Sequence, residues 1–147
     1  MKVLIASDHA GFKLKEKIIE LFSKDNNYDF INLGPHSEER VDYPDFAINL
    51  CEQLKDNELS VLVCGSGQGV AMTANKFPHI RAALCTSLDL AELSRAHNNA
   101  NVLCLGSRTV NEELNLSILK KFLATKFEGG RHQARVDKMK NAYQRKS

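Results

Sequence analysis

Short apolar runs alternate along this 147-residue chain with longer stretches of helical periodicity. The apolar runs predict five strands, over Val3–Ala6, Phe30–Leu33, Val61–Cys64, Ala82–Cys85 and Val102–Leu105. The remaining stretches predict six helices, over Gly11–Lys24, Pro44–Lys55, Gly69–Phe77, Leu88–His97, Asn111–Thr125 and Arg131–Lys146. Because the strands are apolar on both faces and alternate with helices, we predict a five-stranded parallel sheet in a doubly wound, three-layer α/β/α fold of the Rossmann-like type.

The composition fits one globular domain over residues 1–147, because 43% of the residues are hydrophobic and the chain is long enough to bury a core. No apolar run approaches the length of a membrane span, and the first residues are too soon charged for a signal peptide. We therefore expect a cytoplasmic protein without a membrane partner. The four cysteines, at positions 51, 64, 85 and 104, contain no Cys-x-x-Cys pair, which predicts reduced thiols and no metal site.

Positive charge is concentrated in the last helix, although the formal net charge is only +2. Residues 131–147 hold six Lys or Arg and one Asp. Apolar residues such as Val136 and Met139 interrupt the basic ones, as in an amphipathic helix that packs against protein. Since this helix also lacks interleaved aromatic residues, we expect no nucleic-acid partner.

A cysteine lies where the third predicted strand meets a glycine loop, in the segment Val63-Cys64-Gly65-Ser66-Gly67-Gln68-Gly69. Glycines allow the main chain to turn sharply and to present its N–H groups to an anion, and the following helix adds the positive end of its dipole. The same field favours a thiolate, so Cys64 can serve as a base or a nucleophile. The alternative is an inert core thiol, because free cysteines are often buried.

The loop does not fit several common phosphate and nucleophile motifs. Val70 occupies the third glycine position of a dinucleotide-binding loop, and no Gly-Lys-Ser/Thr follows as a P-loop requires. The residue two before Ser66 is Cys64, whereas a serine-hydrolase elbow needs glycine there. A cysteine phosphatase would have arginine six residues after its nucleophile, where this chain has Val70. These mismatches favour a thiol that acts on something other than phosphorus.

Polar residues follow the other strands too, and ligands in such folds bind beyond the carboxyl ends of the strands. Asp8 and His9 follow the first strand, where they could form a polar pair or where Asp8 could simply cap a helix. Arg108 follows the fifth strand and is a candidate anion contact. His97 ends a predicted helix, where an imidazole also suits the helix dipole.

Arg131 and Arg135 are spaced four residues apart and so share one face of the last helix, with His132 beside them. Two guanidinium groups at this spacing suit a phosphate, which accepts bidentate hydrogen bonds. An exposed basic turn is the alternative interpretation.

Seven ordered motifs along the chain resemble one family. They are Ser7-Asp8-His9-Ala10-Gly11, Asp42-Tyr43-Pro44, Cys64-Gly65-Ser66-Gly67, Ala74-Asn75-Lys76, Ser94-Arg95-Ala96-His97-Asn98, Gly106-Ser107-Arg108 and Glu128 to Val136. By these motifs the chain is similar over essentially its whole length to the type B ribose-5-phosphate isomerases, a group that also includes galactose-6-phosphate isomerase. The resemblance implies an aldose–ketose isomerase of the pentose phosphate pathway that needs no cofactor and no metal. It also implies a homodimer with a shared active site, and leaves open whether dimers pair into tetramers.

The resemblance implies a role for individual residues. Cys64 would move the proton between C1 and C2, with Ser66, where the family commonly has threonine, orienting the thiol, and His97 would assist ring opening. The loop of Gly65, Gly67, Gln68 and Gly69 would hold the enediolate. Sugar hydroxyls would contact Asp8 and Tyr43, and phosphate would be held by His9, Arg108 and the partner chain's Arg131 and Arg135, with His132 and Asn98 as further contacts.

Two other functions fit the same residues. An isomerase of a hexose 6-phosphate, such as allose or galactose 6-phosphate, would differ mainly in the dimensions of its loops. A sugar-phosphate sensor would bind the ligand without converting it, because a fold does not establish turnover.

Overall fold

The structure, a computed structural model, describes residues 1–144 of the chain. Its five strands are β1 (Lys2–Ser7), β2 (Asp29–Asn32), β3 (Leu59–Cys64), β4 (Ala82–Leu84) and β5 (Val102–Gly106). They form one sheet in the order β2-β1-β3-β5-β4, and every neighbouring pair is parallel. The predicted five-stranded parallel sheet is therefore confirmed. Each predicted strand overlaps the observed one. Burial on both faces requires the continuous apolar runs of the central strands β1, β3 and β5, and the edge strands β2 and β4 are partly buried.

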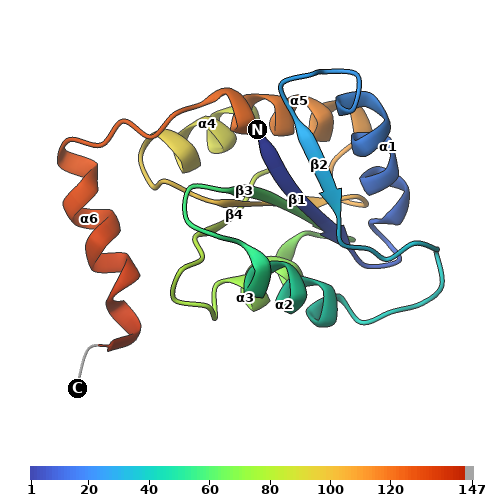
Figure 1. Cartoon of the computed structure of the whole chain (residues 1–147), viewed down its shortest axis with the longest axis horizontal. Coiled ribbons are helices and arrows are strands. Elements are labelled where there is room, and N and C mark those ends of the chain that lie inside the picture. The colour runs from blue at the N-terminus through green and yellow to red at the C-terminus, as the bar shows by residue number, and fades with distance from the viewer. Residues whose placement is uncertain (145–147) are drawn as a thin grey trace.

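Helices cover both faces of the sheet (Figure 1). The helices α1 (Phe12–Phe22), α4 (Leu88–Ala96) and α5 (Glu112–Ala124) pack on one face, and α2 (Tyr43–Gln53) and α3 (Gln68–Ala74) pack on the other. Two hydrophobic clusters fill the spaces between the sheet and these helices, one on each side. The doubly wound, three-layer fold is thus confirmed. In the described part of the chain, no helix has an apolar stretch long enough to cross a membrane.

Helix starts differ from the predicted ones mainly where a predicted first residue acts as a cap. The Oδ1 atom of Asn111 accepts a hydrogen bond from the N–H of Leu114 at 2.8 Å, which places the asparagine just before α5. Tyr43, which directly precedes the predicted start at Pro44, instead forms the first residue of α2. This shift matters for function because it fixes the ring of Tyr43 on a helix end.

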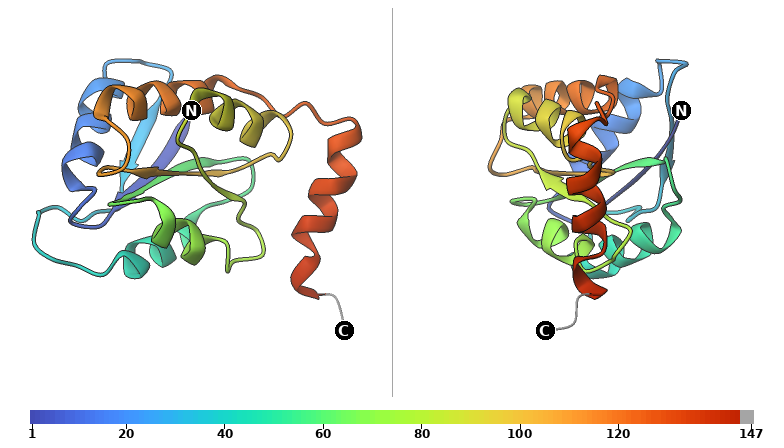
Figure 2. Two further views of the ribbon diagram at one scale, coloured as in Figure 1. Left: turned by 180° about the vertical axis from the view of Figure 1, so that it is seen from behind. Right: turned by 90° about the vertical axis from the view of Figure 1, so that its left-hand side faces the viewer.

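The last helix, α6 (Arg131–Lys140), is shorter than predicted and stands apart from the three layers (Figures 1 and 2). It ends at Asn141, and a 3-10 turn follows over Ala142–Gln144. The rest of the predicted helix lies outside the described residues. Gly129 and Gly130 have φ values of +68° and +53°, a backbone conformation that favours glycine, and they turn the chain just before this helix.

A buried lysine holds the segment that leads from β2 to Tyr43. Lys15 is fully buried, and its ammonium group donates hydrogen bonds to the Pro35 carbonyl oxygen at 2.8 Å and to Asn32 Oδ1 at 3.0 Å. It also pairs with Glu16 at 2.8 Å, so the buried charge is compensated. The lysine thereby ties the loop after β2, which continues to Tyr43, onto α1.

Candidate active site

A cleft of about 560 Å³ opens at the carboxyl edge of the sheet, beside the neighbouring strands β1 and β3. The chain leaves these two strands toward opposite faces, into α1 and α3, which is the arrangement that opens a ligand crevice in doubly wound folds. The lining consists of Asp8, Tyr43, Cys64, Gly65, Ser66, Gly69, Arg108 and Thr109. Seven of these eight residues were predicted from the sequence as site residues, and Thr109 was not.

The thiol of Cys64 accepts a main-chain hydrogen bond. Its Sγ atom lies 3.2 Å from the nitrogen of Gly67, whose N–H donates to it. Gly67 has a φ of +77°, and a Cβ at this position would lie 2.5 Å from Cδ1 of Leu84. Only glycine therefore fits the turn that aims this N–H at the sulfur.

The other three cysteines are unsuited to chemistry at neutral pH. All four are free thiols, and burial, together with the nearby carboxylate of Glu52, raises the pKa of Cys51 to about 12. Burial also raises the pKa of Cys85 and raises that of Cys104 well above its ordinary value. Of the four thiols, Cys64 is the one that lines the cleft.

Asp8 and Tyr43 face the cleft from β1 and α2. The Oδ1 atom of Asp8 accepts a hydrogen bond from the N–H of Gly11 at 2.9 Å, so the carboxylate stabilises the turn into α1 as well as lining the cleft. The ring of Tyr43 lies against Gly69, where a Cβ would come within 2.6 Å of Cε1. A side chain at position 69 would therefore displace the tyrosine from the wall of the cleft.

The loop after β5 is bonded to the cysteine loop. The N–H groups of Ser107 and Arg108 donate to the carbonyl oxygens of Cys64 and Gly65, each at 2.9 Å. The hydroxyl of Ser107 donates to the Ala10 carbonyl oxygen at 2.8 Å, which links the loop after β1 as well. Three strand ends are thus held together, and the exposed side chain of Arg108 lies beside Gly65 at the mouth of the cleft.

Three further predicted residues lie near the cleft without lining it. Nδ1 of His9 lies 3.1 Å from the carbonyl oxygen and 3.2 Å from the nitrogen of Val41, so the backbone of the loop before α2 holds the ring. The N–H of Gln68 donates to Ser66 Oγ at 3.3 Å, and the Gln68 side chain is exposed. The third is Gly67, described above.

The remaining predicted residues lie at the other end of the molecule; they are His97, Asn98, Arg131, His132 and Arg135. His97 ends α4, which returns from the carboxyl edge of the sheet to the start of β5 at Val102. Cys64 is paired with Gly106, at the far end of β5. At about 3.3 Å per strand residue, His97 and Cys64 are separated by on the order of 15 Å within one chain. One chain does not bring the predicted base and the predicted ring-opening residue together.

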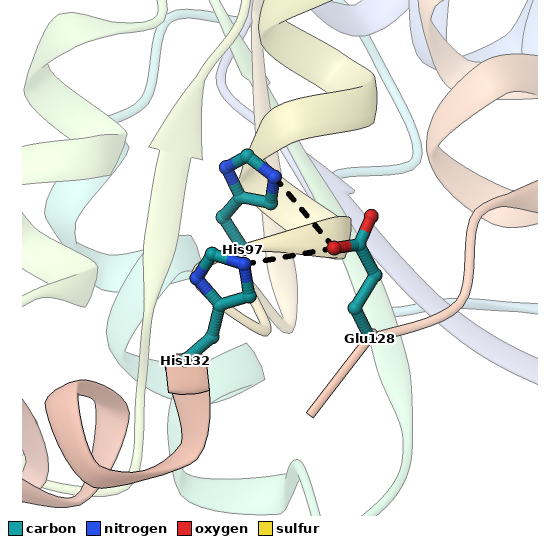
Figure 3. A group of neighbouring side chains, drawn as sticks. All are labelled: His97, Glu128 and His132. Atoms are coloured by element: carbon teal, nitrogen blue, oxygen red, sulfur yellow. Dashed lines mark ion pairs between the residues drawn. The ribbon is translucent and has the colours of Figure 1, made fainter. Parts of the chain in front are cut away.

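At that second end, His97 and His132 stack with their ring centroids 4.2 Å apart, and both rings face Glu128 (Figure 3). Burial lowers the pKa of His132, and the nearby His97 and Arg131 lower it further. The side chains of Arg131 and Arg135 are exposed, and within residues 1–144 neither forms an ion pair. Two unpaired guanidinium groups are therefore available to an anion.

Thr109 and Glu128 are the residues that sequence reasoning missed. Thr109 directly follows Arg108 at a strand end, which was sufficient signal to include it. Glu128 stands four residues before His132, a spacing that can place two side chains together.

Comparison with known proteins points to one family. The model of the Ribose/Galactose Isomerase family matches residues 3–139. The probable ribose-5-phosphate isomerase B of Mycoplasma genitalium is 47% identical over 141 residues, which cover 93% of this chain and 92% of the relative. The ribose-5-phosphate isomerase B of Escherichia coli K12 is 39% identical over 148 residues, covering 99% of both chains.

Solved structures give the same result. Ribose-5-phosphate isomerase B of Clostridium thermocellum superposes with a TM-score of 0.93 at 43% identity, covering 98% of each chain. The Mycoplasma genitalium enzyme with bound ribulose-5-phosphate superposes with a TM-score of 0.92 at 43% identity, covering 99% of this chain and 97% of the other. On these matches in sequence and structure, this chain belongs to the Ribose/Galactose Isomerase family.

Proposed function

We propose that this protein interconverts ribose 5-phosphate and ribulose 5-phosphate, with Cys64 as the base that moves a proton between C2 and C1. The observation that carries this proposal is the cleft in which the Cys64 thiol accepts a main-chain N–H beside Asp8, Tyr43 and Arg108. Full-length relatives named for this activity support it, and one of them has ribulose-5-phosphate bound.

The reaction has two steps. First, the sugar ring opens when the hydroxyl on C1 loses its proton and the ring oxygen gains one as its bond to C1 breaks. Then the Cys64 thiolate takes the proton from C2, and the electron pair of the C–H bond moves through C1 onto the carbonyl oxygen. A proton passes from the oxygen on C2 to the oxygen on C1, and the thiol returns its proton to C1, which leaves a hydroxyl on C1, the ketone at C2 and the thiolate. The loop of residues 65–69 would stabilise the enediolate between these transfers through main-chain N–H groups other than that of Gly67, which donates to the thiol, and that of Gln68, which donates to Ser66. Such preorganised donors are often the largest catalytic contribution. Neither step requires a cofactor.

A second copy of the chain would complete the site. Because His97 and the exposed pair Arg131 and Arg135 lie far from the cleft of their own chain, we propose that they reach the cleft of a partner in a homodimer. There His97 would assist ring opening, and the arginines would hold the phosphate with Arg108 and His9. Asn98 and His132 would be further contacts. A clamped phosphate supplies binding energy away from the reacting carbons and holds the open chain in place.

The activity is tested with purified protein and ribose 5-phosphate in the presence of a metal chelator, with ketose formation as the readout. We expect conversion without added metal. Binding of ribose 5-phosphate that raises the melting temperature without conversion would instead identify a sensor. Comparing kcat/KM for ribose 5-phosphate, allose 6-phosphate and galactose 6-phosphate decides between pentose and hexose substrates. The hexose phosphates are included because the matching family is named for both ribose and galactose isomerases.

The shared site is tested by mixing two inactive variants, Cys64→Ala and His97→Ala. In a heterodimer, one site combines both substitutions and the other has neither. Random reassortment after joint refolding should therefore restore about a quarter of the wild-type activity. Cys64→Ala refolded alone is the control. If the mixture remains inactive although mass spectrometry detects heterodimers, Cys64 and His97 do not act across the dimer.

A further inference from the structure

Three potential metal ligands converge at the second end of the molecule. Nε2 of His97 lies 3.8 Å from Oε1 of Glu128, and Nε2 of His132 lies 3.6 Å from the same oxygen (Figure 3). All three ligand atoms are within 4.8 Å of one another. None of these three residues lines the cleft that contains Cys64.

The backbone holds this group in place. The N–H of Glu128 donates to the carbonyl oxygen of Ala96 at 3.0 Å, which fixes the glutamate beside the end of α4 where His97 stands. Gly129 and Gly130 then turn the chain at positive φ, and the N–H of His132 donates to the Gly129 carbonyl oxygen at 3.0 Å. His132 is buried, so its ring is held over His97 by packing as well.

The chemistry of this donor set suits zinc and similar ions. Imidazole nitrogen and carboxylate oxygen bind Zn²⁺ at about 2.0–2.2 Å, so that tetrahedral ligands lie about 3.3 Å apart. The present nitrogen–oxygen distances need to shorten by only about half an ångström, with the stacked rings tilting until their lone pairs converge.

Neighbouring cations limit the affinity. Arg131 directly precedes His132 on α6, and Arg135 lies one turn further along. Both guanidinium groups repel a dication, and Glu128 is 59% exposed, so water competes for its carboxylate. These features fit an ion that exchanges with solvent rather than one that is permanently bound.

We propose that His97, Glu128 and His132 form a reversible binding site for a transition-metal dication of the zinc class, with water completing the coordination. The ion is not a cofactor for isomerisation. It occupies the His97 nitrogen, and because the proposed function assigns that residue to ring opening, metal loading inhibits the enzyme. The binding site itself does not depend on the proposed function.

Binding is tested on chelator-stripped full-length protein by zinc calorimetry and by the visible spectrum of bound Co²⁺. We expect one ion per chain, and a loss of affinity of at least about tenfold in His132→Gln and in Glu128→Gln. His36→Ala, which removes an exposed histidine, should leave the affinity unchanged. Cys64→Ser should leave it unchanged too. Loss of zinc binding in Cys64→Ser, or full affinity in His132→Gln with native circular dichroism, overturns the proposal.

Inhibition is tested by initial rates with zinc and by their recovery after chelation. We expect the zinc concentration for half inhibition to rise in Glu128→Gln in parallel with the measured loss of affinity. Binding by calorimetry without any loss of rate overturns the inhibitory role of the site and the assignment of His97 to ring opening. Absence of zinc binding from a protein that isomerises ribose 5-phosphate overturns the metal site and leaves the proposed function intact.

Discussion

The two ends of the molecule hold their polar side chains in different ways. At the carboxyl edge of the sheet, the loops after β1, β3 and β5 are hydrogen-bonded to one another, and Cys64 and Asp8 are buried to 95% and 93%. At the other end, α6 stands apart from the layers and buries two of its residues, His132 and Val136, while Arg131 and Arg135 are exposed.

Under the proposed function, this contrast separates proton-transfer chemistry, which needs rigid placement, from phosphate binding, which needs a second chain. A base and its amide donors must be placed within fractions of an ångström, and three strand ends that are hydrogen-bonded to one another achieve that in one chain. A phosphate clamp tolerates long side chains, because a guanidinium group can reach for its ligand. The helix that carries the proposed phosphate clamp can therefore stand apart from the body and still reach a partner chain.

The largest effect on activity is expected from a substitution at the carboxyl edge of the sheet. Cys64→Ala should lower kcat by about 10² to 10⁴-fold, since a positioned general base contributes that much to a proton transfer. Steady-state kinetics with ribose 5-phosphate measure the loss, and circular dichroism checks the fold. Cys51→Ala, which removes a thiol whose pKa burial raises to about 12, should retain activity. A Cys64→Ala protein that turns over normally would show that the thiol is inert.

The exposed arginines of α6 should act mainly through substrate binding. Arg135→Ala would remove the proposed charge-assisted contact with the phosphate. Such a contact is worth about 1.5–3 kcal/mol, so we expect KM to rise by about tenfold to a hundredfold with a smaller change in kcat. Lys138→Ala removes an exposed cation from the same helix and is the matched control. Equal effects of the two substitutions would mean that general positive charge, and not this guanidinium group, attracts the substrate.

The fold could be predicted from the sequence because the central strands β1, β3 and β5 are buried on both faces and the edge strands β2 and β4 are partly buried, and the apolar runs carry that information directly. The C-terminal boundary of α6 could not be predicted in the same way. Its charged residues continue past Lys140 with no proline or glycine to stop them, and a helix with two buried residues gains little from packing. Lys15 is a similar case, since nothing local distinguishes a fully buried lysine from an exposed one on an amphipathic helix.

The cleft was predictable for a topological reason. Parallel strands bring their carboxyl ends to one edge, so Asp8, Cys64 and Arg108 had to lie near one another. The same rule places His97 at the opposite edge, because a helix in such a fold runs back toward the start of the next strand. The resemblance to a family supplied His97 as a site residue, but the sequence pattern alone carries no sign of the role that we propose for it in the cleft of a partner chain.

Glycine-to-alanine substitutions compare how much the two ends of the molecule contribute to the free energy of unfolding. Gly67→Ala places a methyl group 2.5 Å from Leu84 at a φ of +77°, so strain and overpacking should together cost about 2–5 kcal/mol of unfolding free energy. Gly129 has a φ of +68° but no atom within 4 Å of the added Cβ, so Gly129→Ala should cost only about 1 kcal/mol. Urea unfolding at one protein concentration measures both. Similar midpoints would show that the packing around Gly67 contributes little.

The smallest effect is expected at the wall of the cleft. Tyr43→Phe keeps the ring that lies against Gly69 and removes only the hydroxyl, which we propose contacts the sugar. One neutral hydrogen bond contributes about 0.5–1.5 kcal/mol, so KM should rise by about two- to tenfold while kcat changes little. Tyr43→Ala, which removes the ring as well, should have the larger effect, because it also takes away the side chain packed against the loop that holds Cys64. If Tyr43→Phe matches Tyr43→Ala, the hydroxyl carries the whole contribution, whereas wild-type kinetics in Tyr43→Phe would assign the residue to packing alone.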